Sequence, residues 1–377
     1  MAVKFKNKLF YVCFVIILVL IGGLRLYHLL TREEFAPETN SQSENINLVY
    51  LNMVTKNEGW AIGLNKVYRT IDGGARWEDV TPQGAEKIHT WYFLNSDLGW
   101  ILSSRDSKGI LYRTENGGRH WVQEEVPFNL GLLFFIPSEK SYNGWALKDY
   151  GPASGSSPVD VYKLMNGSWS LIHKGQGPDT TLEKPGTLPY AGDKNGFVFL
   201  PDAKTGFVTI EYREPGKYGL YVTRDGGYTW LQSILPIPSE YRKSGIYITA
   251  PAFFKTDEKE YAGILPVWFM NKEDDYSVVF FITHDKGESW TGTTPLRTKE
   301  RIVSINITDI SHWWVLTEAK LYGTRDGGNT WTQLDYPEGA VQVQFVNPEI
   351  GWALVKLDTG TGILRTDDGG VSWKRLF

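Results

Sequence analysis

One short motif recurs along most of the chain and limits the folds that it can adopt. The motif reads Thr, any residue, Asp or Asn, Gly or Lys, Gly, two further residues and Trp, and it follows an apolar run. Six copies end at Trp77, Trp121, Trp230, Trp290, Trp331 and Trp373, and a degenerate copy, VYKLMNGSW, ends at Trp169. Neighbouring copies end 41 to 61 residues apart, and one blade of a β-propeller takes about 40–50 residues. We therefore expect a ring of similar sheets, with loop insertions where the spacing is longest.

The motif has the chemistry of a tight β-hairpin. Asp-Gly and Gly-Gly supply the positive φ angles of such turns, and the Thr hydroxyl and Asp carboxylate can accept hydrogen bonds from amides of the same turn. The tryptophan then begins the next strand, where we expect it to pack against a neighbouring blade. The predicted structural residues are Thr70, Asp72, Gly74, Trp77, Asn116, Trp121, Asp225, Trp230, Asp285, Trp290, Asp326, Trp331, Asp368 and Trp373. Because blades radiate from an axis, these aspartates cannot converge on one catalytic or calcium site.

A second element, a Gly-aromatic pair that opens a short apolar strand, precedes most copies. It appears at Gly59-Trp60, Gly99-Trp100, Gly144-Trp145, Gly206-Phe207 and Gly351-Trp352, with Trp313-Trp314 in the sixth unit and only Ala262-Gly263-Ile264 in the fifth. With the β-rich run before the pair, each unit has four strands, which is one blade. The expected fold is all-β, a seven-bladed β-propeller of four-stranded antiparallel blades over 46–377, preceded by one N-terminal transmembrane helix. The blades are expected at 46–82, 83–128, 129–175, 192–237, 245–297, 300–338 and 339–377, and the ring should close by packing, without a shared strand.

The N-terminus has the pattern of a membrane anchor. Residues 1–8 carry three lysines and 9–24 carry no charge, so we expect a cytoplasmic tail at 1–8, a transmembrane signal-anchor at 9–30 and a polar stalk at 31–45. A cleaved signal peptide is the alternative, and both readings export the propeller. The only cysteine is Cys13, and the lack of disulfides leans towards a bacterial envelope protein. The expected location is the cell membrane, single-pass, with the propeller extracytoplasmic.

Charge and histidine content exclude several functions. The net charge is −4, with no basic excess, so nucleic-acid binding is disfavoured. The six histidines show no metal-ligand spacing. We expect no metal, no cofactor and no nucleic-acid partner, and the sequence does not indicate an oligomeric state.

The hairpin copies resemble the Asp-box, or bacterial neuraminidase repeat, and their combination with GWAIG (59–63) and GWALV (351–355) is most like the photosystem II assembly and stability factor family of propellers. The resemblance covers about 46–377 and implies a propeller scaffold. Resemblance to sialidases on the same fold would imply an arginine trio, a Tyr-Glu nucleophile pair and an acid/base Asp. Arg213, beside Glu211 and Tyr212, is the best-placed arginine for such a site, whereas Arg69, Arg113 and Arg365 lie next to hairpins.

The loops that depart from the repeat give the functional hypothesis, because variable loops on a rigid scaffold carry function. The candidate binding surface, expected in blades three to five, contains Glu211, Tyr212, Arg213, Asp257, Glu258, Asp274 and Asp275. The favoured reading is a non-catalytic, membrane-anchored extracytoplasmic propeller. It would be a binding scaffold for a protein or an envelope polymer, with assembly of a membrane complex as one role. The alternative is an exported sialidase-like glycoside hydrolase.

Overall fold

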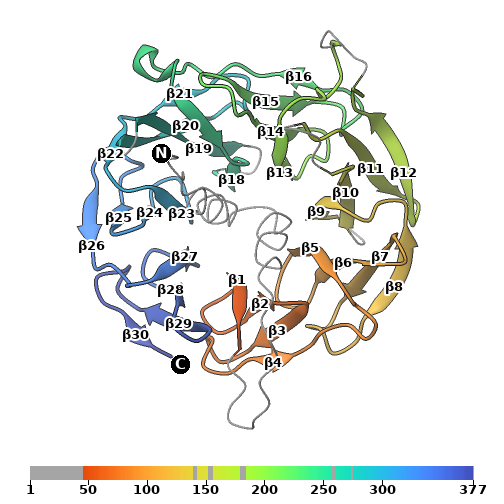
Figure 1. Ribbon diagram of the computed structural model, residues 1–377, viewed down its shortest axis with the longest axis horizontal. Helices are drawn as coiled ribbons and strands as arrows, with labels where there is room; N and C mark the ends of the chain where they lie inside the picture. Colours follow the sequence, from red (N-terminus) through yellow and green to blue (C-terminus); the bar gives the residue numbers. More distant parts are fainter. Residues whose placement is uncertain are drawn as a thin grey trace, which may run out of the picture.

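The computed structural model describes residues 46–138, 142–151, 156–178, 184–256, 260–272 and 275–376. Seven antiparallel sheets surround a central axis (Figure 1), which confirms the all-β, seven-bladed propeller. The predicted tail (1–8), transmembrane anchor (9–30) and stalk (31–45) lie outside the described residues. Across the ranges given above, no helix is long and apolar enough to cross a membrane.

Blades one to four each contain four consecutive strands, paired in chain order from the axis outward. Blade one comprises β1 (Leu48–Met53), β2 (Gly59–Gly63), β3 (Lys66–Thr70) and β4 (Glu78–Asp79), and blade two β5 (Ile88–Phe93), β6 (Gly99–Arg105), β7 (Lys108–Thr114) and β8 (Val122–Val126). Blade three comprises β9 (Gly131–Pro137), β10 (Tyr142–Asp149), β11 (Val159–Met165) and β12 (Ser168–Lys174), and blade four β13 (Asp193–Phe199), β14 (Gly206–Glu211), β15 (Tyr218–Thr223) and β16 (Leu231–Gln232).

Blades five to seven follow the same plan, with an enlarged fifth blade. Blade five comprises β17 (Gly245–Ile248), β18 (Ala252–Lys255), β19 (Tyr261–Lys272), β20 (Asp275–Thr283), β21 (Thr291–Gly292) and β22 (Leu296–Thr298), and a 3₁₀ turn, η2 (Ser239–Tyr241), precedes it. Blade six comprises β23 (Ile302–Ile307), β24 (Trp313–Thr317), β25 (Leu321–Thr324) and β26 (Thr332–Leu334), and blade seven β27 (Ala340–Phe345), β28 (Gly351–Lys356), β29 (Thr361–Thr366) and β30 (Lys374–Arg375). In blade five, β17 and β18 both pair with β19, and β21 and β22 both pair with β20, so the inner and outer strands are each interrupted once.

An indole near the start of the second strand joins blades one, two, three and six to the blade that follows. A Cβ on Gly351 would lie 2.4 Å from the Phe345 ring, so only glycine lets that ring lie across the neighbouring strand. The ring then stacks on Trp314 of the preceding blade, with 3.8 Å between centroids. The same stack forms at Trp60–Phe93 (4.5 Å), Trp100–Phe135 (3.8 Å) and Trp145–Phe199 (4.0 Å). These stacks explain why the fold requires so many indoles.

Blade five carries the one unit whose Gly-aromatic pair is incomplete in the sequence. Gly263 pairs with Thr283 in the register that Gly59 has with Thr70, which confirms Ala262-Gly263-Ile264 as the equivalent segment. Ile264 stands where most other blades have an indole, so it cannot form this ring stack with blade six. There, Trp313 fills the junction instead and stacks 4.5 Å from Phe280 of blade five.

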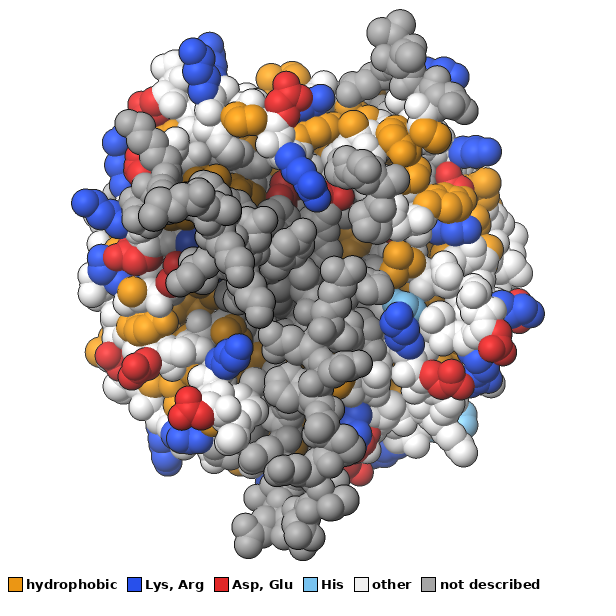
Figure 2. Space-filling view, in the orientation of Figure 1, with side chains coloured by type: hydrophobic (Ala, Val, Ile, Leu, Met, Phe, Trp, Pro, Cys, Tyr) orange, Lys and Arg blue, Asp and Glu red, His pale blue; other side chains and the backbone are white. Residues whose placement is uncertain are grey.

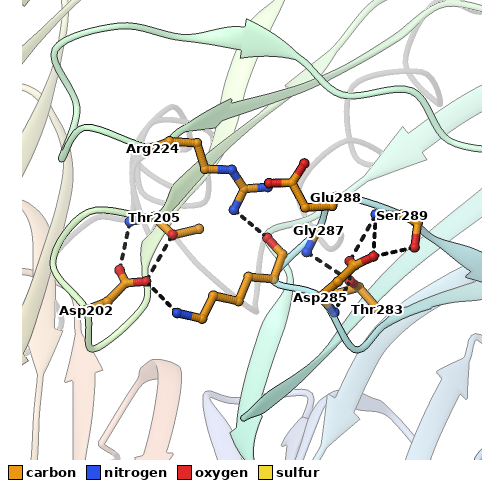
Figure 3. Close-up of polar contacts among 9 residues, drawn as sticks. Asp202, Thr205, Arg224, Thr283, Asp285, Gly287, Glu288 and Ser289 are labelled. Atoms are coloured by element: carbon orange, nitrogen blue, oxygen red, sulfur yellow. Dashed lines mark hydrogen bonds and ion pairs between the residues drawn. The ribbon is translucent and has the colours of Figure 1, made fainter. Parts of the chain in front are cut away.

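The hairpins between third and fourth strands share one hydrogen-bond pattern, shown for blade five in Figure 3. The Thr283 hydroxyl accepts the Gly287 amide at 2.8 Å, and the Asp285 carboxylate accepts the Ser289 amide at 2.9 Å. All six copies of the motif make both bonds, at 2.8–3.0 Å and 2.9–3.0 Å. Bonds of this kind, led by the Thr330 hydroxyl, lower the pKa of Asp326 to about 2. Five carboxylates and the Asn116 side-chain amide therefore stabilise their own turns.

The ring closes where blade seven meets blade one, and no strand is shared there. Gln342 accepts a hydrogen bond from the Leu51 amide at 2.9 Å and donates to the Leu51 carbonyl at 2.6 Å. Gln344 does the same with Met53, at 2.6 Å and 2.9 Å. Each side-chain amide thus pairs with a strand backbone as a neighbouring peptide group would. Buried apolar side chains form seven clusters, one at each junction, so the same core continues across this seam.

Candidate functional site

The two faces of the ring carry different connections. The hairpin face carries the turns between third and fourth strands and the loops between first and second strands. The opposite face, here called the pocket face, carries the other two kinds of connection, including the two long ones between Asp149 and Val159 and between Lys174 and Asp193. Ile46 lies on the pocket face, because its carbonyl accepts a hydrogen bond from Thr361 at the start of β29.

A pocket of about 620 Å³ opens on the pocket face where blades two and three meet. Blade two supplies Lys87, His89 and Lys108, and blade three supplies Lys148 at the end of β10. In the chain between the blades, the exposed Pro127 and the half-buried Leu130 form an apolar wall. The pocket therefore combines lysines and an apolar surface in one concavity, as ligand sites commonly do.

A buried polar pair lies within the lining. His89 is only 6% exposed, and its Nε2 lies 2.7 Å from the Ser104 hydroxyl. Both residues line the pocket. This contact fixes the imidazole against the end of β6, so the pocket wall is rigid at this point.

A buried lysine lies near the pocket, on the first strand of blade four. Lys194 donates hydrogen bonds to the carbonyls of Tyr190, Ala191 and Gly192, at 3.0, 3.1 and 3.0 Å. Burial lowers the pKa of Lys194 to about 8, while the negative charge of Asp149, a pocket residue, acts in the opposite direction. This lysine fastens the long connection between blades three and four to the ring.

Two further side chains hold the long connections of the pocket face. Tyr150 donates to the Asp160 carboxylate at 2.6 Å, and burial together with this bond raises the pKa of Tyr150. His173 donates from Nδ1 to the Tyr228 carbonyl at 2.9 Å and accepts the Leu188 amide at Nε2 at 3.2 Å. Burial lowers the pKa of His173, so the neutral ring that this arrangement requires is favoured.

The residues predicted as a binding surface are only partly brought together. Glu211 ends β14 on the pocket face of blade four, Lys217 lies 4.5 Å above the Tyr212 ring, and Arg213 is exposed. Asp275 begins β20 and is exposed. The predicted residues Asp257, Glu258 and Asp274 lie outside the described residues.

The two ends of β19 in blade five carry acidic residues on opposite faces of the ring. Glu260 directly precedes β19, and Asp275 follows it at the start of β20. The twelve residues of this strand extend roughly 40 Å at about 3.3 Å per residue. Glu260 therefore lies on the hairpin face and Asp275 on the pocket face.

The arginines that a sialidase site would need are distributed over separate blades. Arg69 donates to the Gly59 carbonyl and pairs with Glu58, in blade one. Arg113, in blade two, pairs with Glu115, and Arg365, in blade seven, pairs with Asp367. Arg365 also donates to the Lys56 carbonyl of blade one, so these guanidinium groups stabilise loops and turns next to the hairpins. In the part of the chain that the structure describes, no group of three or more His, Cys, Asp or Glu residues could hold a metal ion.

Comparison with known proteins identifies the fold. No family model and no curated protein matches the sequence. A solved structure of YCF48 bound to a D1 peptide has 17% identity and a TM-score of 0.50, over 85% of this chain and 92% of that one. An ancestral GH74 enzyme has 14% identity and a TM-score of 0.53, over 87% of this chain and 46% of the enzyme. An uncharacterised protein of Listeria monocytogenes EGD-e has 9% identity and a TM-score of 0.52, over 90% and 97%.

The likeness is one of fold. At these identities, binding and catalysis do not transfer between chains that share an architecture. This chain also spans less than half of the GH74 enzyme.

Proposed function

We propose that this protein is a non-catalytic propeller of the Asp-box type that binds an extended segment of another protein at its pocket face. The observation that carries the proposal is the pocket between blades two and three, with its lysines and apolar wall. The fold similarity to YCF48, which was solved with a bound peptide, is in keeping with a peptide as the ligand. An envelope polymer is the alternative ligand.

Membrane anchoring would fix which face of the propeller is turned towards the membrane. If residues 9–30 form the signal-anchor, the chain reaches the propeller at Ile46, which lies on the pocket face. The pocket would then be turned towards the membrane, and the hairpin face away from it. A partner that projects a short segment from the bilayer would meet the pocket first, as a factor in assembly of a membrane complex requires.

Glycoside hydrolysis is the second candidate function, and the placement of the arginines disfavours it. Arg69, Arg113 and Arg365 lie in three different blades, and each forms an ion pair with an acidic residue of its own blade. A sialidase-like site would need such groups around one substrate carboxylate. Turnover of a sialoside or another glycan by the purified protein would overturn the non-catalytic assignment.

Site-directed photo-crosslinking in membranes tests the proposed face. A photoreactive side chain replaces Tyr150 on the pocket face, and in a matched variant it replaces Ile71 in a hairpin. Both native side chains are exposed, at 55% and 69%, so accessibility does not separate them. We expect a discrete protein adduct from position 150 only. Equal adducts from both positions, or a protein adduct from neither, would refute binding at the pocket face.

A further inference from the structure

Three lysines from separate parts of the sequence surround one concavity. Lys87 precedes β5, Lys108 begins β7, and Lys148 lies near the end of β10 in the next blade. No sequence motif connects them, since 21 residues separate the first two and 40 the second two. The packing of blade two against blade three places all three lysines in the lining of the same pocket.

The positive charge of this pocket is only partly neutralised. Lys108 pairs with Glu125 at 3.1 Å, and both are largely exposed. Lys148 lies over the Tyr150 ring, 4.5 Å from its centroid. Lys87 has no acidic partner among the described residues, and its side chain is exposed. Two of the three ammonium groups are therefore available to an anionic ligand.

The remaining lining favours a peptide over a polyanion. Pro127 and Leu130 supply apolar surface for a side chain, next to the lysines. Glu125 and Asp149 also line the pocket, and carboxylates accept hydrogen bonds but cannot donate them. A polyphosphate would present only acceptors and be repelled by these two groups, whereas a peptide presents N–H donors together with its own carboxylates.

From this lining we propose that the pocket binds a carboxylate of an extended acidic peptide, held between Lys87 and Lys148 with a neighbouring apolar side chain against 127–130. This inference rests on the proposed function and specifies its ligand. The carboxylate can come from an Asp or Glu side chain or from the end of a chain. Charge-assisted hydrogen bonds to lysine supply the affinity, and the apolar wall restricts the register.

Fluorescence anisotropy with synthetic peptides tests the inference on the full chain in detergent. The probe is a labelled short peptide in which glutamate alternates with leucine, blocked at both ends. A second peptide has glutamine in place of glutamate, and a third has glutamine with a free carboxyl terminus. We expect the glutamate peptide to bind at least about tenfold more tightly than the blocked glutamine peptide, since hydrogen bonds to a charged group are stronger than those between neutral groups. The third peptide distinguishes a terminal carboxylate from a side-chain one.

Charge reversal locates the binding. Lys148→Glu and Lys87→Glu should each weaken the glutamate peptide about tenfold or more. Lys356→Glu is the matched control, because Lys356 ends the second strand of blade seven and pairs with the start of its third strand. The control should leave binding unchanged. Circular dichroism and melting curves of all three variants show whether any loss of binding comes from unfolding.

The outcomes separate this inference from the proposed function. Equal affinity for the glutamate and blocked glutamine peptides, or equal losses in Lys148→Glu and Lys356→Glu, would overturn the carboxylate pocket. A crosslinked protein partner at position 150 would then still support the proposed function. Tighter binding of a soluble teichoic acid than of any peptide, lost in Lys148→Glu, would replace the peptide by an anionic polymer and overturn both.

Discussion

The two glutamines at the seam should carry a large share of the stability of the ring, and Gln342→Ala tests this directly. The side chain is 4% exposed and makes two hydrogen bonds to the Leu51 backbone. Its removal leaves a buried N–H and a buried C=O without a partner, at about 1–3 kcal/mol each. We expect the free energy of unfolding to fall by about 2–5 kcal/mol.

Chemical denaturation followed by tryptophan fluorescence measures this loss, with two controls. Gln342→Met keeps the volume but removes the hydrogen bonds, so it should retain most of the destabilisation. Gln333→Ala, at an exposed position of β26, should change stability by no more than about 0.5 kcal/mol.

Hydrogen exchange locates the effect, because the seam is the one junction where the blades are not consecutive in the chain. It can open without unfolding a blade, so the amides of Leu51 and Met53 should exchange faster in Gln342→Ala than in the native protein. If Gln342→Ala and Gln333→Ala are equally stable, the seam is held by apolar packing alone and the reasoning fails.

Three further predictions concern turns, cross-strand packing and pH. Gly351→Ala should destabilise the protein by about 1–3 kcal/mol in a denaturant titration, whereas Gly245→Ala, whose nearest contact is 3.6 Å, should cost much less. Lys286 has a φ of 59°. Lys286→Gly and Lys286→Ala both lose an ion pair with Asp202 that is worth about 0–1 kcal/mol, but only glycine relieves the strained backbone. Lys286→Gly should therefore be at least as stable as Lys286→Ala, and a less stable glycine variant would contradict this. The pKa of His173 is lowered in the folded protein. Its contribution to the free energy of unfolding is therefore complete above about pH 6.5 and is lost as pH falls through the folded pKa. His173→Gln should flatten that dependence, and an unchanged pH profile would exclude His173 as its source.

The turns and the strand order were predictable because their causes are local. Each Thr-x-Asp-Gly-Gly segment carries the side chains that bond its own amides, at Thr70 and Asp72 as at Thr366 and Asp368. In blade five, Ala262-Gly263-Ile264 was the only available segment in the sequence, and Gly263 does pair with Thr283 as the equivalent glycine does in blade one. In contrast, the phenylalanines that stack on the Gly-Trp indoles were missed, although a Phe stands six or seven residues before Gly99 and Gly206.

The candidate site was much less predictable. Glu211, Tyr212 and Arg213 do reach the pocket face, as loop residues of a variable blade can. In blade five, Glu260 and Asp275 are close in sequence, but the continuous strand β19 separates them. The seam glutamines had a weak signal, two polar residues at alternate positions of the apolar run VQVQF. Nothing local marked the lysine pocket.

The sequence by itself determined the period, the hairpin chemistry and the number of blades, because each repeat contains the residues that fold its own sheet and turn. The tertiary structure alone decided which side chains meet between blades. Lys87 and Lys148 share a pocket, and Gln342 reaches Leu51, because the curvature of the ring brings together residues that lie 61 and 291 positions apart. That curvature depends on how all seven sheets pack, and no single repeat encodes it.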